Sequence, residues 1–61
     1  MDIREEQLIE FFKKSGANEE QARVMSRQMV RRATQLATER GWSEVQAMQH
    51  LLKLFLEARG Q

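Results

Sequence analysis

Four arginines near the middle of the chain are the residues best suited to hold a ligand. Arg23, Arg27 and Arg31 recur every four residues, and Arg32 follows directly. Residues four apart lie along one face of a helix, so this spacing would stack the three guanidinium groups in a row. A guanidinium group binds phosphate or carboxylate through two parallel hydrogen bonds. The pattern therefore predicts an anion-binding row, and nucleic acid is one partner that it would suit.

The same arginines can instead serve as an ordinary solvated face. No acidic residue lies between residues 21 and 38, but Glu19 stands four residues before Arg23 and can pair with it. Carboxylates of the acidic N-terminal segment could reach other arginines. Exposed ion pairs of this kind contribute little to stability. Under this interpretation the arginine row binds nothing.

The sequence contains few residues of the types that carry out catalysis. The chain has no Cys, no Tyr and a single His, and no Gly-rich phosphate loop is present. A nucleophile needs a neighbouring base, and a metal site needs several ligands of the His, Cys or carboxylate type. We therefore expect no enzyme activity, no catalytic residue, no metal site, no cofactor and no small-molecule substrate. The one histidine, His50, is expected to lie exposed on the polar side of its helix.

The length of the chain limits what can position these groups. With 61 residues and a mass of 7.2 kDa, the chain is predicted to form a single three-helix domain, residues 1–61. The absence of cysteine excludes disulfides, so a domain this small needs well-formed helices or self-association for stability. The longest apolar run is residues 54–56, too short to cross a bilayer, so no membrane partner is expected. The default location is the cytoplasm.

Helix start and stop signals each occur three times. Asp2, Asn18 and Ser43 are each followed by Glu or Gln three residues later, the spacing of a capping box. Basic residues precede each of the three glycines, as expected at helix ends. Apolar residues between these signals step by three and four. The pattern predicts an all-α fold, a three-helix antiparallel bundle or hairpin array, with helices at about 3–14, 19–40 and 44–59.

The third predicted helix carries more apolar surface than one contact requires. Its apolar residues cover roughly 200° of the helix circumference, whereas a surface helix typically needs about 100°. The excess predicts that part of this helix buries against another chain, either a second copy, giving a homodimer, or a different protein. The predicted interface residues are Trp42, Val45, Leu52, Leu54 and Leu56.

Residues 33–52 resemble a helix-turn-helix DNA-binding motif. That motif has a small residue, a Gly four positions later, an apolar residue and then a Ser or Thr that opens the recognition helix. The matching residues are Ala37, Gly41, Trp42 and Ser43. The chain departs from the motif at Arg40, where an apolar residue is expected. The resemblance implies DNA binding, with the helix after Ser43 in the major groove.

Two functions follow from these patterns. The first is a small protein–protein interaction or regulatory module that self-associates through its third helix. The alternative is a small nucleic-acid-binding regulator that uses the arginine row on the second helix, Arg23, Arg27, Arg31 and Arg32. Salt separates the two, because phosphate binding weakens steeply with added salt whereas apolar association does not.

Overall fold

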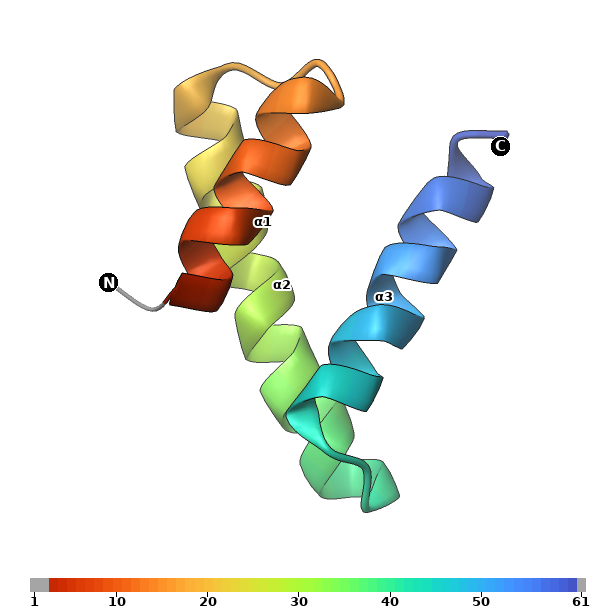
Figure 1. Cartoon of the computed structure of the whole chain (residues 1–61). Helices are drawn as coiled ribbons and strands as arrows, with labels where there is room; N and C mark the ends of the chain where they lie inside the picture. The colour runs from red at the N-terminus through yellow and green to blue at the C-terminus, as the bar shows by residue number, and fades with distance from the viewer. Residues whose placement is uncertain (1–2, 61) are drawn as a thin grey trace. The chain divides into compact units, whose positions relative to one another are not determined.

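A computed structural model describes residues 3–60 of the chain (Figure 1). The described residues form three helices and no strand, with α1 at Ile3–Lys14, α2 at Glu19–Arg40 and α3 at Glu44–Ala58. The predicted all-α, three-helix class is confirmed, and each predicted helix end agrees to within one residue. The capping residue expected for α1, Asp2, lies outside the described residues.

The helices pack as two units that divide within α2. One unit is Met1–Val30 and the other is Arg31–Gln61. The first unit holds α1 and the first part of α2, and the second holds the last ten residues of α2 together with α3. Within each unit a short turn joins two helices that run in opposite directions, as the sequence predicts (Figure 1). The single domain over residues 1–61 stays a prediction.

Each interhelical turn contains a glycine with a left-handed backbone. At the end of α1, the Ala17 N–H donates to the Phe12 carbonyl and the Gly16 N–H donates to the Lys13 carbonyl, each at 3.1 Å. This pair of hydrogen bonds is a Schellman motif, which satisfies carbonyls that the helix leaves unpaired. Gly16 has a φ of +111° and Gly41, at the end of α2, has a φ of +68°. Any other residue type would be strained there, which explains why the helices stop at these points.

Side chains cap the starts of α2 and α3. The Gln21 N–H donates to Asn18 Oδ1 at 2.8 Å, and the Asn18 N–H donates to Gln21 Oε1 at 3.3 Å. These reciprocal bonds form the capping box that the sequence predicts. At α3, the Gln46 N–H donates to Ser43 Oγ at 3.0 Å. The capping box at Asn18 is therefore confirmed, and at Ser43 the hydrogen bond to the capping hydroxyl is confirmed.

The unit Met1–Val30 has a core built around one aromatic ring. Phe12 is 1% exposed, and Leu8 and Ile9 are also buried on α1. On α2, Ala22 and Ser26 are fully buried. They lie one turn apart on one face of α2, where their small side chains allow another element to approach closely.

Ser26 stands out in this core because its hydroxyl has no hydrogen-bond partner among the described residues. A buried hydroxyl without a partner has lost its hydrogen bonds to water and gained none in return, which costs about 1–3 kcal/mol. We therefore expect Ser26→Ala to raise the free energy of unfolding by about 1 kcal/mol, helped by the higher helix propensity of Ala. The midpoint of urea denaturation measures this change.

Ser15 provides the matched control for that measurement. Its Oγ donates to the Phe11 carbonyl at 3.0 Å, so its hydroxyl does have a partner. Ser15→Ala should leave the free energy of unfolding unchanged or lower it. Equal stabilisation by the two variants would show that the effect at Ser26 comes from removing any serine rather than from its unpartnered hydroxyl.

The unit Arg31–Gln61 has a core of small residues. Its buried apolar side chains are Ala33 and Ala37 on α2, and Ala47 and Leu51 on α3. No large aromatic side chain of this unit is fully buried among the described residues. Alanine removes little apolar area from water, so the fully buried residues of this unit bury less apolar surface than Phe12, Leu8 and Ile9 do in Met1–Val30.

Candidate interaction surface

Large apolar side chains remain exposed along α3. Val45 is 59% exposed, Leu54 is 47% exposed and Leu56 is 41% exposed. Leu52 and Trp42, the other predicted interface residues, are half-buried. Single exposed leucines are common on protein surfaces, but several on one short helix form a patch. The position of each around the helix axis therefore decides which of them can contact a partner together.

Three of the predicted interface residues share one side of α3. At about 100° per residue, Val45, Leu52 and Leu56 fall within about 40° of one another around the helix axis. We call these three residues the α3 stripe. Leu54 lies about 160° away from Leu56, on the opposite flank of the helix. A single flat partner surface can therefore contact the stripe but not Leu54 at the same time.

The stripe continues onto two further apolar side chains. Met48 and Phe55 are half-buried and lie between the stripe and the buried residue Leu51 around the helix. The Arg59 guanidinium lies over the Phe55 ring, 5.6 Å from its centroid. The apolar surface thus runs along most of α3 and ends beside a basic residue.

Trp42 lies in the turn before α3 and contacts two polar side chains. Its ring centroid is 5.3 Å from that of His50, with the ring planes at 70°, and the Arg40 guanidinium lies 5.2 Å from its centroid. Trp42 thus contributes to the α2–α3 turn as well as to the surface. The expectation that His50 is exposed was wrong, because His50 packs on this ring and is half-buried.

The four arginines of the predicted anion-binding row differ in their surroundings. Arg23 Nη2 lies 4.0 Å from Glu19 Oε1, and Arg27 Nε lies 4.0 Å from Glu5 Oε1 on α1. The predicted Glu19–Arg23 pair is therefore present, and the second pair uses a carboxylate of the first helix. Both pairs are long, and only Glu5 among their four side chains is half-buried, so each pair contributes little to stability.

Arg31 and Arg32 have no such partner among the described residues. Both are exposed, and no carboxylate oxygen of the described residues lies within 4.0 Å of either guanidinium. They belong to the unit Arg31–Gln61, whereas Arg23 and Arg27 belong to the other unit. In the described structure, these two arginines, which are consecutive in the sequence, are therefore available for an anion.

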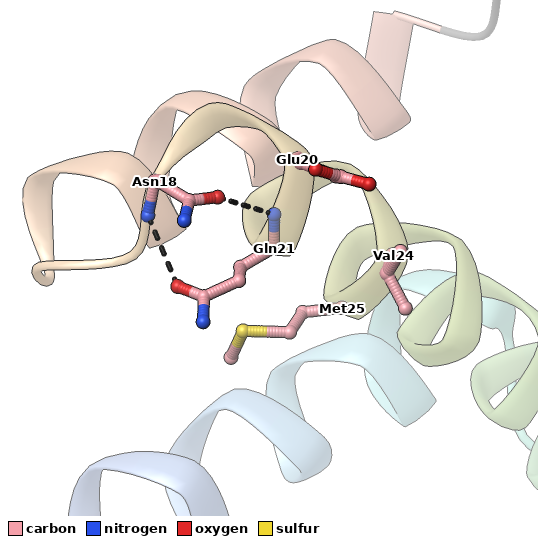
Figure 2. A pocket seen from close by; sticks show the side chains of 5 residues that line it. All are labelled: Asn18, Glu20, Gln21, Val24 and Met25. Carbon is pink, nitrogen blue, oxygen red and sulfur yellow. Dashed lines mark hydrogen bonds between the residues drawn. The ribbon is translucent and has the colours of Figure 1, made fainter.

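A shallow open depression lies at the start of α2 (Figure 2). It encloses about 630 Å³ and has the capping box, Asn18 and Gln21, at its polar end. The hydrogen bonds of the capping box already occupy these amides. The other side chains that line it are Glu20, Val24 and Met25, of which Val24 is exposed. Glu20, Val24 and Met25 provide one carboxylate and two apolar contacts, and this combination of side chains is not one that catalyses a reaction.

Two other findings concern ligands and membranes. Among the described residues, no group of three or more His, Cys, Asp or Glu side chains is placed to hold a metal ion. Within the same residues, no helix has the length and apolar character needed to cross a bilayer. The expectations of no cofactor and no enzyme activity stay predictions.

Sequence reasoning missed two features of these surfaces. Val24 follows Arg23 on α2 and is exposed, and the residues of the capping box beside it could have marked the depression. The contact of Trp42 with His50 depends on how the turn directs the Trp42 ring, which helix periodicity does not describe.

No protein-family model, curated protein or solved structure matches the chain.

Proposed function

We propose that this protein is a small interaction module that self-associates through the α3 stripe, Val45, Leu52 and Leu56. One observation carries the proposal: the unit Arg31–Gln61 buries only three alanines and one leucine, while Val45, Leu54 and Leu56 stay exposed. Fully burying a Val or Leu side chain is worth about 1.5–3 kcal/mol. A partner that covers the stripe would therefore supply the apolar burial that this unit lacks.

The size of the surface sets the expected strength. A face on one short helix buries less than the roughly 1,200–2,000 Å² of a stable protein–protein interface. Self-association is therefore expected to be reversible and to depend on protein concentration. The module acts by binding, without catalysis or a cofactor. A cytoplasmic location belongs to this proposal and is supported by the absence of cysteine from the sequence.

Sedimentation equilibrium tests the proposal directly. We expect the apparent mass to rise above 7.2 kDa with protein concentration, both at low and at physiological salt. Apolar association should persist when salt screens the surface charges. A monomer at every concentration and at both salts would contradict self-association.

A second candidate function, nucleic-acid binding, is favoured by the two unpaired arginines. Arg31 and Arg32 are adjacent, exposed and without a carboxylate partner in the described part of the chain. The resemblance to a helix-turn-helix motif also supports this candidate. As in that motif, a Ser, here Ser43, caps the second helix, and a Gly, here Gly41, lies in the turn with a positive φ. Under this proposal the arginines bind the phosphate backbone, and α3 is the helix presented to the groove.

Replacing Arg31 and Arg32 with Gln should then weaken the binding of duplex DNA and reduce its salt dependence. The logarithm of the binding constant falls with the logarithm of the salt concentration, and each lost phosphate contact is expected to reduce the magnitude of this slope by about one. Fluorescence anisotropy of a labelled duplex at several salt concentrations measures both effects. The matched control replaces Arg23 and Arg27, which already have carboxylate partners, and should change the slope less. Unchanged binding by the Arg31/Arg32 variant would eliminate this candidate.

A further inference from the structure

We infer that the α3 helices of two copies pair in the antiparallel direction, so that the start of one helix faces the end of the other. This inference rests on the proposed self-association and specifies its geometry. The occupant of the α3 stripe is then a second copy of this chain. The pattern of apolar residues, the charges at the two ends of α3 and its dipole all favour this arrangement.

The apolar pattern along α3 can pair with itself. Val45, Met48, Leu52 and Phe55 are spaced by three, four and three residues, the repeat by which two helices form a straight seam. None of the four is fully buried. In an antiparallel pair, Val45 meets Phe55 of the second copy, and Met48 meets Leu52. Leu56 follows Phe55 and lies about 20° from Val45 around the helix, so it flanks this seam close to Val45 of the second copy. A two-fold axis repeats both contacts, so one patch serves both copies.

The charges at the two ends of α3 select the direction. Glu44 lies in the first turn of α3 and Arg59 is its C-terminal cap residue. An antiparallel pair brings each Glu44 close to Arg59 of the second copy, whereas a parallel pair places like charges side by side. The helix dipoles act in the same sense, because they oppose each other only in the antiparallel pair.

The absence of cysteine from the sequence makes a clean cross-linking experiment available. Val45 and Leu56 are exposed in the described structure, so Val45→Cys and Leu56→Cys should each leave the fold intact. The two positions are separated by about 16 Å along the helix axis. A disulfide needs Cα atoms within about 7 Å of each other. Each introduced thiol can therefore reach only one of the two positions on the second copy.

The experiment oxidises each variant alone and then an equal mixture of both. Mass spectrometry identifies the disulfide-linked species, and sedimentation equilibrium under reducing conditions verifies that each variant still associates. In the mixture, we expect the disulfide that joins a Val45→Cys chain to a Leu56→Cys chain to form in large excess over either homodimeric disulfide. Leu54→Cys is the matched control, because it lies on the opposite flank of α3 and should form no disulfide with either variant.

Three results would overturn the inference. If each variant alone forms its own disulfide as readily as the mixture forms the mixed one, the helices are parallel. If the variants associate when reduced but no disulfide forms in any sample, another surface holds the two copies together. If the unmodified chain and both variants sediment as monomers, the proposed function fails and takes this inference with it.

Discussion

Replacing Phe12 with alanine is expected to leave most of the chain unfolded at room temperature. Phe12 is 1% exposed and is the largest fully buried side chain in the described part of the protein. Truncation of a buried Phe to Ala costs about 3–5 kcal/mol, because apolar contact is lost and a cavity remains. A single core in a domain of this size rarely supplies more than about 3–5 kcal/mol. Far-UV circular dichroism should show most of the helical signal lost.

The neighbouring ring gives a matched control for this prediction. Phe11 is half-buried, and its ring meets the edge of Phe12 with centroids 5.3 Å apart and planes at 74°. An aromatic pair of this kind contributes about 0.5–1.5 kcal/mol beyond its buried area. Phe11→Ala should therefore lower the urea midpoint while leaving a folded population. Equal losses for the two variants would mean that Phe12 is not the centre of this core.

The second large effect is expected at Leu56. Leu56→Asp should raise the dissociation constant for self-association by roughly a hundredfold or more, about 2.8 kcal/mol, because each copy would have to bury an unpaired carboxylate. Leu56 is 41% exposed in the described structure, so the isolated chain should keep its helical content. Sedimentation equilibrium and circular dichroism on the same samples measure the two quantities separately.

Leu54→Asp is the appropriate comparison, because it makes the same change two residues away. Leu54 is similarly exposed but lies about 160° from Leu56 around α3. We expect Leu54→Asp to leave the dissociation constant nearly unchanged. If it dissociates the protein as strongly as Leu56→Asp does, both flanks of α3 are interfaces. If Leu56→Asp instead unfolds the chain, Leu56 belongs to the core.

The helix boundaries were predictable because they depend on local chemistry. Asn18 and Gln21 form their capping box through hydrogen bonds between residues three apart, and Gly16 and Gly41 adopt backbone angles that other residues avoid. These preferences act within a few residues and leave a direct trace in the sequence. The excess of apolar surface on α3 was also predictable, because it follows from the spacing of apolar residues along one helix.

What periodicity could not show is how each core would be filled. Ser26 shares a face with Ala22, and nothing in its residue type indicates a buried hydroxyl without a partner. The arginine row looked uniform in sequence, yet Arg27 meets Glu5 across two helices whereas Arg31 meets no carboxylate in the described structure. Such differences depend on contacts between helices, which spacing along one helix does not determine.

The alanine core of the unit Arg31–Gln61 has a consequence for how the protein would respond to its own abundance. Under the proposed self-association, the unit with the buried residues Ala33, Ala37, Ala47 and Leu51 would gain stability when a second chain covers the α3 stripe. Binding that requires the folded form stabilises it by mass action. Amide hydrogens of α3 should then exchange more slowly as the protein is concentrated, while those around Phe12 change little. The fraction of chains in which α3 is ordered would then rise with the concentration of the protein.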